Sequence, residues 1–399
     1  MTAGTQIRPL RPEDTEQVFH LRVAAFSGEA RVDYDPDEIY IPDEHRLVAV
    51  DGARVVGHLG VWPFGQAFGG RAVPAGGVAA VVVADDRRGT GVGSRLLAAG
   101  LEHMGRVGMA ISTLYPSTPA PYRRWGWEVA GVNVRRRVAT RDLLDIPAPS
   151  GQLALRPYTP ADLAAVVAVH DALALAEHGG LVAGERWLRR ALEPDPDEPD
   201  ITIVATREDQ PVGLVQAAKT PPEDDHSSFG LRVRRLFGVD RDVERALWRF
   251  IGHHHPIAAM TSFRSRPAEP LLFELPYGMH LPAPASEHFM TRLVDVPAAI
   301  AARGWPAVSV TVELDIVDQR RPAASGRHVL EVTDGAGVMK PGGAGGIAVD
   351  IGAFSSLYTG FATAAQLAHA GRLAGASGDD IAALTEIFAA PLPYLTEYF

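Results

Sequence analysis

Residues 78–97 read VAAVVVADDRRGTGVGSRLL, and this stretch decides the predicted fold. Its three consecutive valines, residues 81–83, are β-branched and apolar, which favours a buried strand. Asp85 and Asp86 end that strand, and one of the two carboxylates is expected to cap the structure that follows. The residues from 94 to about 104 predict an amphipathic helix. The stretch therefore predicts a strand, a glycine-rich turn and a helix in succession.

The glycine-rich turn, Arg88-Gly89-Thr90-Gly91-Val92-Gly93, has the features of an anion site. Glycines let the backbone approach an anion closely, and the free N–H groups at the start of the helix point toward it. The lysine and hydroxyl of a P-loop are missing, so a nucleoside triphosphate is a poor match. A dinucleotide motif would require glycine at Ser94 or Leu96, and neither position has one. A turn of purely structural use remains the alternative to a phosphate-binding loop.

The composition of the 399-residue chain is that of a globular protein with two or three domains. Hydrophobic residues make up 46% of the chain, which is enough for sizeable cores. No run approaches the roughly 20 apolar residues that cross a bilayer. Because the N-terminal residues lack an apolar signal core, we expect a cytoplasmic protein with no membrane partner.

Charge and residue usage narrow the possible chemistry. The absence of cysteine excludes disulfides, thiolate metal sites and cysteine nucleophiles. Three adjacent histidines, residues 253–255, cannot all point at one metal ion from regular structure, so no metal site is expected. A formal net charge of −10 argues against nucleic acid as a partner and mildly favours a cationic substrate.

The segment before residue 78 predicts a strand, a helix and a hairpin. A strand at 7–10 precedes a helix at 12–26 with acidic residues in its first turn. Residues 47–61 form the predicted hairpin around Asp51-Gly52, which is a favoured two-residue turn. The four acidic residues of the segment Asp33–Glu38 either face a bound cation or belong to a solvated loop.

A proline-rich segment with a tyrosine follows the next predicted strand, residues 110–114. Pro116, Pro119 and Pro121 stiffen this loop, and Tyr122 opens a short turn before a Trp-Gly-Trp sequence. A tyrosine hydroxyl can hydrogen-bond a leaving group and protonate it as a bond breaks. The alternative is an aromatic ring that only packs.

The pattern of the first third is then repeated. Residues 155–162 resemble residues 7–14, and the segment 201–215 resembles the hairpin at 47–61. A repeat of this length indicates two similar domains rather than a solenoid. Where the second copy should have its glycine-rich turn, residues 238–247 read GVDRDVERAL. Branched and acidic side chains block close approach and repel phosphate, so we expect the second copy to bind no such ligand.

From about residue 286 the pattern changes to a third region of α+β type. A helix is expected over 298–303, begun by residues 290–297. We further expect strands at 308–317, 326–331 and 346–349, a glycine-rich turn at 341–346, and helices at 351–357, 361–368 and 381–388. The predicted domains are 1–150, 151–285 and 286–399.

The chain ends in PLPYLTEYF, which is apolar and aromatic and contains two prolines. Chain termini are usually polar and frayed, so a tail of this kind is expected to dock against the protein. Its terminal carboxylate on Phe399 has an ordinary pKa of about 3.5, which burial would raise. Such a carboxylate suits a base that takes a proton from an ammonium group.

These features together resemble the enhanced-intracellular-survival (Eis) family of GCN5-related N-acetyltransferases (GNATs), over essentially the full chain. The resemblance is carried by the three valines, Arg88-x-x-Gly91-x-Gly93, the Ser117-to-Tyr122 spacing followed by Arg-x-Gly-Trp, and the C-terminal Tyr398-Phe399. It implies an α/β (α+β) chain with an active GNAT domain, a degenerate second GNAT domain and a sterol-carrier-protein-like C-terminal domain.

The resemblance also implies a reaction and a set of residue roles. Acetyl-CoA would be the co-substrate, no metal would be used, and the acceptors would be amines of cationic small molecules, aminoglycosides among them, often at several positions. A homohexamer is implied. Tyr122 would be the general acid and the terminal carboxylate of Phe399 the base. The implied acetyl-CoA contacts are Val81, Val82, Val83, Arg88, Gly89, Thr90, Gly91, Val92, Gly93, Ser117 and Thr118.

One segment departs from the family pattern, and two other functions stay open. Residues 118–121 read TPAP, which is bulkier and stiffer than the glycine-containing loop expected before the tyrosine, and this bears on substrate range.

Acetylation of peptide or protein lysines would use the same chemistry with a different cleft. A lipid- or sterol-carrying protein is the alternative from another class, and it would need a continuous apolar tunnel in the C-terminal domain.

Overall fold

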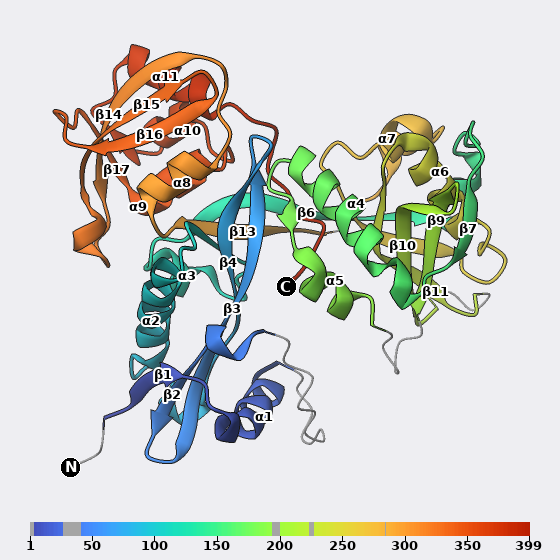
Figure 1. Cartoon of the computed structure of the whole chain (residues 1–399), viewed down its shortest axis with the longest axis horizontal. Coiled ribbons are helices and arrows are strands. Elements are labelled where there is room, and N and C mark those ends of the chain that lie inside the picture. The colour runs from blue at the N-terminus through green and yellow to red at the C-terminus, as the bar shows by residue number, and fades with distance from the viewer. Residues whose placement is uncertain (1–3, 27–40, 194–199, 223–226, 284) are drawn as a thin grey trace. The chain divides into compact units, whose positions relative to one another are not determined.

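The computed structural model describes residues 4–26, 41–193, 200–222, 227–283 and 285–399. The chain divides into two compact units, and many of their elements are labelled in Figure 1. Unit 1 contains residues 1–130, 289–391 and 399, and unit 2 contains residues 131–288 and 392–398. The acidic segment Asp33–Glu38 lies outside the described residues.

The N-terminal part of unit 1 is a sheet flanked by helices. Neighbouring strands follow the order β1 (Gln6–Pro9), β2 (Arg46–Asp51), β3 (Arg54–Phe68), β4 (Arg71–Val83), β5 (Ile111–Leu114) and β13 (Ala285–Leu293). Among the described pairs of this set, β4–β5 alone is parallel. The helices are η1 (Pro12–Asp14), α1 (Thr15–Phe26), η2 (Asp43–His45), η3 (Asp85–Arg87), α2 (Val92–Arg106) and α3 (Pro119–Arg123). The predicted hairpin around Asp51-Gly52 and the predicted strand, turn and helix of residues 78–97 are confirmed.

Helix α2 has one apolar face, and that face fixes its place on the sheet. Its buried residues recur at the helical spacing and pack with residues of β2, β3 and β4, among them Leu59 and Val61. Gly76 of β4 lies under this helix, because a Cβ there would be 2.6 Å from the sulfur of Met104. The helix therefore starts where the glycine-rich turn ends and is held there by its core contacts.

The two repeats exchange their last strands. The strand that ends the second repeat, β13, joins the sheet of unit 1, and the strand that ends the first repeat, β6 (Glu128–Ala139), joins the sheet of unit 2. In unit 1, the last four residues of β13 pair antiparallel with β5, from Met290 opposite Leu114 to Leu293 opposite Ile111. In unit 2, β6 pairs antiparallel with β12 (Met260–Ser265). The prediction that residues 290–297 begin a helix is wrong for residues 290–293, which are strand. The partner of this strand is far away in the sequence, so no local pattern announces it.

Unit 2 repeats the sheet of unit 1. Its strands are neighbours in the order β7 (Ala154–Pro157), β9 (Asp200–Arg207), β10 (Gln210–Thr220), β11 (Gly230–Gly238), β12 and β6. The β11–β12 pair is parallel, as β4–β5 is in unit 1. The remaining elements are η4 (Thr140–Asp145), η5 (Pro160–Asp162), α4 (Leu163–Ala176), β8 (Leu181–Val182), α5 (Gly184–Ala191), α6 (Arg241–Gly252), α7 (Leu271–Glu274) and η6 (Gly278–His280). The predicted repeat is confirmed, while the domain boundaries at 150 and 285 stay a proposal.

The C-terminal part of unit 1 has a second sheet in the order β16 (Ala336–Pro341), β15 (Gly326–Thr333), β14 (Ser309–Val317), β17 (Ile347–Asp350) and β18 (Leu373–Ala374). Its helices are α8 (Val296–Ala302), η7 (Pro322–Ala324), α9 (Ile351–Tyr358), α10 (Ala364–His369) and α11 (Gly378–Phe388). The α+β prediction is confirmed, although the sequence reading missed β16 and β18.

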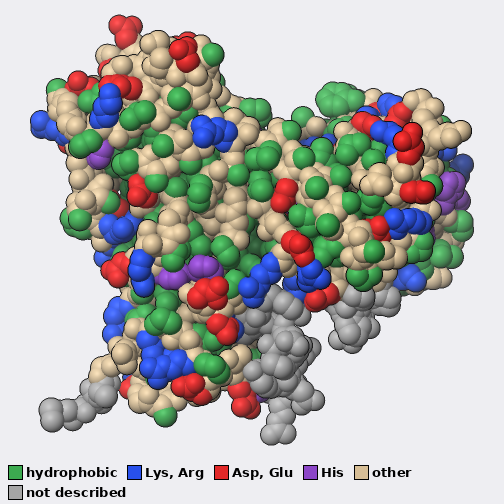
Figure 2. All heavy atoms as spheres, in the orientation of Figure 1, with side chains coloured by type: hydrophobic (Ala, Val, Ile, Leu, Met, Phe, Trp, Pro, Cys, Tyr) green, Lys and Arg blue, Asp and Glu red, His purple; other side chains and the backbone are tan. Residues whose placement is uncertain are grey.

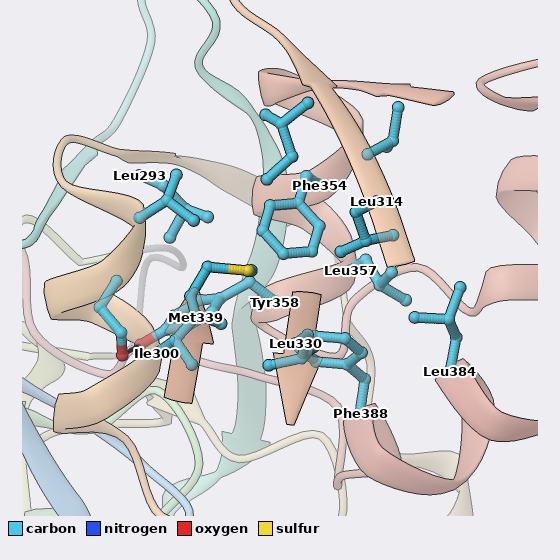
Figure 3. Packing of buried hydrophobic residues seen from close by; sticks show 14 of the residues in the cluster. Leu293, Ile300, Leu314, Leu330, Met339, Phe354, Leu357, Tyr358, Leu384 and Phe388 are labelled. Carbon is cyan, nitrogen blue, oxygen red and sulfur yellow. Dashed lines mark hydrogen bonds between the residues drawn. The ribbon is translucent and has the colours of Figure 1, made fainter. Parts of the chain in front are cut away.

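One hydrophobic core joins this C-terminal part to the N-terminal sheet of unit 1. Leu314, Leu330 and Phe354 pack in the cluster that Figure 3 shows, and Phe68 and Ile111 of β3 and β5 belong to the same cluster. The hairpin between β3 and β4 also approaches the backbone after α8, since Gly304 donates its N–H to the carbonyl of Phe68 at 3.0 Å. The C-terminal part thus braces the strands that carry the glycine-rich turn.

The surface and the helices give two further observations. Acidic and basic side chains are interspersed over the face that Figure 2 shows. Within the described part of the chain, no helix combines the length and the apolar character needed to pass through a bilayer.

Candidate active site

Strands β4 and β5 separate after a short paired stretch. They pair from Ala75 opposite Ile111 to Gly77 opposite Thr113, and β4 then continues to Val83 with no partner on that edge in the described structure. Val82 is buried, and Val81 and Val83 are half-buried. The backbone N–H and C=O groups along this edge are therefore available to a ligand.

A bulge interrupts β4 just before the valines. The pairing register with β3 shifts between His58 and Gly60, and Ala80 has a φ of +52°, a left-handed value that is uncommon for alanine. Nδ1 of the fully buried His58 lies 2.9 Å from the carbonyl oxygen of Ala80. Burial lowers the pKa of His58 to about 3, so the ring is neutral and Nδ1–H donates to this carbonyl. His58 thus holds the bulge, a role that the sequence reading missed.

The glycine-rich turn leaves the start of α2 open. Gly91 is the N-cap residue with a φ of +86° and no side-chain cap, and Gly89 has a φ of +76°. A Cβ at either glycine would meet no atom within 4 Å. The first helical hydrogen bond runs from the N–H of Arg95 to Gly91 at 3.1 Å, so the amides of residues 92–94 have no partner among the described residues. Unpartnered amides at a helix start are a feature that suits an anion.

The expected cap by an aspartate is wrong. Asp86 forms an ion pair with Arg54 at 2.7 Å, and Asp85 forms one with Arg88 at 3.0 Å. Gly91 occupies the cap position instead, because the turn between Val83 and the helix is longer than the two aspartates can span. The vacant cap is what leaves the helical amides open to an external anion.

The side chains of the other turn residues differ in their exposure and contacts. Thr90 is exposed, and its hydroxyl donates to the carbonyl of Arg87 at 2.6 Å. Val92 is buried in the core under α2. The Arg88 guanidinium is largely exposed beside the turn, where it pairs with Asp85.

Tyr122 sits at the end of α3, the short helix that the proline-rich segment forms. Its carbonyl accepts N–H groups from Trp125 at 2.9 Å and Trp127 at 3.2 Å, which fixes the turn. Its ring meets Trp127 edge-on at 6.2 Å between centroids. Burial raises the pKa of Tyr122, and its hydroxyl makes no hydrogen bond within the described residues. The hydroxyl is therefore a protonated donor with its capacity unused.

Trp127 connects Tyr122 to the separated strands. The indole Nε1 donates to the hydroxyl of Ser112 at 3.2 Å, and that hydroxyl donates to the carbonyl of Gly76 at 3.1 Å. Ser117 and Thr118 lie exposed between β5 and α3, with Thr118 at the N-cap position. The structure thus brings Tyr122 into contact, through Trp127, with the point where β4 and β5 diverge.

Phe399 docks at that same point. Its ring lies 5.0 Å from the ring of Phe64 and 5.7 Å from that of Tyr115. A Cβ on residue 77 would lie 2.7 Å from Cε2 of Phe399, so the glycine at this position makes room for the terminal residue. No ion pair to the terminal carboxylate exists among the described residues. A glycine pair inside a strand is a signal of close approach, and this signal could have located the docking point.

The second copy lacks these openings. The segment between strand and helix covers residues 84–91 in unit 1 and shrinks to Val239 and Asp240 in unit 2. The Asp240 carboxylate caps α6 by accepting the N–H of Val243 at 3.0 Å. A Cβ on Gly238 would lie 2.6 Å from Val243, so the turn has no free space. An internal carboxylate therefore takes the place that an external anion could take in unit 1.

Glu397, two residues before the chain end, fits the role of a base less well than the terminal carboxylate. Glu397 is buried in unit 2 beside Arg235 and His170, and although burial raises the pKa of its carboxyl, these cations lower it to about 2. A carboxylate of such low pKa is a weak base. Within the described chain, no group of three or more His, Cys, Asp or Glu residues could hold a metal ion.

Three family models match the chain. Two describe an acetyltransferase (GNAT) domain, at residues 6–130 and 179–293, and the third describes a sterol carrier protein domain at residues 296–396. They follow one another in the order of the two repeats and the C-terminal part described above.

Relatives and solved structures of similar length match nearly the whole chain. An uncharacterized N-acetyltransferase of Streptomyces avermitilis is 28% identical, covering 92% of this chain and 93% of the relative. A GCN5-related N-acetyltransferase from Anabaena variabilis superimposes with a TM-score of 0.90 at 26% identity, covering 99% of this chain and 100% of that one. Eis1 from Mycobacterium abscessus has a TM-score of 0.82 at 23% identity, covering 99% and 100%, and at this identity the likeness shows the fold.

Proposed function

We propose that this chain, a GCN5-related N-acetyltransferase with an Eis-like fold, transfers the acetyl group of acetyl-CoA to amino groups of cationic small molecules. Aminoglycosides, which present several such groups, are the proposed acceptor class, with transfer at several positions. The chain has 48 acidic and 38 basic residues, and this net negative charge favours the approach of a cation.

Acetyl-CoA would lie along the open edge of β4 and across the start of α2. The free amides of residues 92–94 suit its pyrophosphate, with Arg88 as a mobile counter-charge. Gly89, Gly91 and Gly93 permit the close approach. The further proposed contacts are Val81, Val82, Val83, Thr90, Val92, Ser117 and Thr118.

Three groups of the chain would carry the chemistry. The thioester supplies an activated acetyl group, and an N–H of the bulged β4 backbone near Val83 would polarise its carbonyl. The terminal carboxylate of Phe399 would take a proton from the attacking amine as the C–N bond forms. The hydroxyl of Tyr122 would give a proton to the departing thiolate as the C–S bond breaks.

One observation carries the proposal: the uncapped N-terminus of α2 beside the unpaired edge of β4. The second copy differs at this point, because the Asp240 side chain caps the start of the corresponding helix, α6. A turn of purely structural use would have no need to leave its amides unpartnered.

The test is direct acetylation of candidate amines. The full chain and acetyl-CoA are incubated in three separate reactions with an aminoglycoside, a lysine-containing peptide and a simple monoamine. The masses of the products are measured by mass spectrometry. The proposal expects additions of one or more acetyl groups on the aminoglycoside. Acetylation of the peptide alone would replace the small-molecule acceptor by the protein-lysine alternative. No acetylation of any amine would contradict the proposal.

The lipid-carrier alternative has less support. Side chains such as Leu314, Leu330 and Phe354 fill the centre of the C-terminal part by packing on one another (Figure 3). That core also takes in residues of the N-terminal sheet, which suits a brace better than a carrier.

A homohexamer and a cytoplasmic location, where acetyl-CoA is available, go with this proposal through the family resemblance. Light scattering on the purified chain tests the assembly, with an expected mass six times the 42.6 kDa of one chain. A mass of one or two chains would contradict the hexamer.

A further inference from the structure

The C-terminal segment 392–398, here called the tail, belongs to unit 2 and is bound there like an added strand. Val132 of β6 donates its N–H to the carbonyl of Pro393 at 3.0 Å and accepts the N–H of Leu395 at 3.1 Å. The N–H of Tyr394 adds a bond to the carbonyl of His178 at 3.2 Å. Backbone pairing on both sides gives the tail a fixed path through the unit.

The tail closes the opening between β11 and β12. These strands pair from Leu231 opposite Thr261 to Val233 opposite Phe263, and β11 then continues to Gly238. Residues 233–237, together with residues 395–397 of the tail, line a cavity of about 70 Å³. This volume holds a few water molecules, whereas a pocket for a cofactor-sized ligand has about 300 Å³ or more. The opening that would receive acetyl-CoA in unit 1 is therefore occupied in unit 2 by the chain itself.

Glu397 is the charged anchor of the tail. It is 6% exposed, with Oε2 lying 3.4 Å from Nη2 of Arg235 and Oε1 lying 3.9 Å from Nε2 of His170. Nδ1 of His170 in turn lies 2.9 Å from the carboxylate of Asp171. Arg235 is itself fixed, since Nη1 donates to the carbonyl of Ala191 at 2.7 Å. A buried ion pair of this kind is costly to break, because it leaves one charge without a partner.

The charges of this anchor support one another. Burial alone would lower the pKa of His170, but the carboxylates of Asp171 and Glu397 raise it to about 9. Trp187 of α5 and Phe237 of β11 are the rings that face the imidazole. At neutral pH the ring is thus cationic, and it stands between two carboxylates.

We propose that the second GNAT copy has become a receptor for the tail, and that Glu397, held by Arg235 and His170, is the positioning residue for the terminal carboxylate of Phe399. This inference rests on the proposed function. Tyr398 alone separates the two residues, and two residues span at most about 7 Å. Because Phe399 docks in unit 1, a loosened Glu397 releases the proposed base from its place, and a shift of about 1 Å can cost 10²-fold in rate.

The test compares Glu397→Gln with Glu386→Gln, a control on the exposed face of α11. For Glu397→Gln we expect kcat at pH 7 to fall by about 10-fold or more, with the affinity for acetyl-CoA within about twofold of the parent. The loss should shrink as the pH approaches the pKa of the acceptor amine, where a base is no longer needed. A loss of the same size at every pH would contradict positioning of a base, and an unchanged kcat would contradict any positioning role.

A second readout does not depend on acetylation. Carboxypeptidase should release Phe399 and Tyr398 from Glu397→Gln faster than from the parent or from Glu386→Gln, because an anchored tail stays on the protein and does not enter the active site of the protease. Equal rates of release would overturn the receptor, whatever the enzyme acetylates. A chain that acetylates no amine but shows faster release from Glu397→Gln would keep the receptor and refute the proposed function.

Discussion

The side chain of Tyr122 packs through its ring and has a hydroxyl that is available to donate. Its ring lies against Trp127, while its hydroxyl makes no hydrogen bond within the described residues. Tyr122→Phe keeps the packing and removes the donor. We therefore expect acetyl-CoA affinity to stay within about twofold and kcat to fall by roughly 10²–10⁴-fold. Calorimetry and steady-state kinetics at pH 7 measure the two effects, and an unchanged kcat would leave Tyr122 as a packing residue.

His58 holds the bulge of β4 by a hydrogen bond, and burial keeps its ring neutral. We therefore expect His58 to make the fold less stable at acidic pH. The pKa of His58 is about 3 in the folded chain and about 6.5 when unfolded, so between these values the unfolded chain binds a proton that the folded chain does not. The free energy of unfolding therefore falls as the pH drops from 6.5 toward 3, by up to about 1.4 kcal/mol per pH unit from this residue. Urea unfolding of the full chain at several pH values measures the slope.

The matched variant for this prediction is His58→Asn. Asparagine can still donate to the carbonyl of Ala80 from the position of Nδ1, but it does not titrate. Its unfolding free energy should fall less steeply below pH 6.5 than that of the parent, while the remaining buried acids contribute equally to both. Equal slopes would show that His58 is protonated without penalty in the folded chain.

At the scale of elements, we expect the start of α2 to decide whether the fold binds an anion. Gly91→Asp would place a carboxylate at the cap position, where Asp240 caps α6 in the second copy. Aspartate tolerates the left-handed conformation of this position, so the helix should form. The new charge would occupy the free amides and repel the pyrophosphate, and we expect acetyl-CoA affinity to fall by 100-fold or more.

The control for this variant is Gly108→Asp. Gly108 has a φ of +80° and open space around its Cβ position, like Gly91, but it follows the far end of α2. Isothermal titration should give parent-like affinity for this control and one acetyl-CoA per chain for the parent. Two bound molecules per chain would contradict the loss of binding in the second copy.

Local patterns predicted the repeated elements well, because a strand, a glycine-rich turn and an amphipathic helix are each encoded in adjacent residues. The site details depend on contacts between distant segments and were missed for that reason. His58 is an isolated histidine in an apolar strand until Ala80 is seen to bulge toward it. Residues 290–293 read as the start of a helix until they are seen to pair with β5 on the edge opposite β4. The docking of Phe399 was expected from its apolar tail, but its place beside Gly77 required the fold.

At the scale of the whole molecule, the exchange of β13 and β6 makes the first repeat incomplete on its own. A fragment of residues 1–150, the proposed first domain, lacks the strand that pairs with β5 and the C-terminal residues that share its core. It would expose a strand edge and a large apolar surface, and we expect aggregation and no acetyl-CoA binding. Co-expression with residues 151–399 should restore a soluble complex. A monomeric fragment with cooperative unfolding would contradict this dependence.

The chemical role proposed for the chain terminus can be tested with a tag. Appending a few residues after Phe399 puts a peptide bond where the carboxylate was, and deleting Phe399 leaves the new carboxylate about 3.5 Å short. In both variants we expect near-parent folding and acetyl-CoA affinity but a sharp loss of turnover, largest below the pKa of the amine, where the substrate arrives protonated. An N-terminal tag of the same sequence is the control. Full activity of the C-terminally extended chain at pH 7 would refute the base, and Glu397 could not replace it, because a carboxyl with a pKa of about 2 that is paired with Arg235 is a poor proton acceptor.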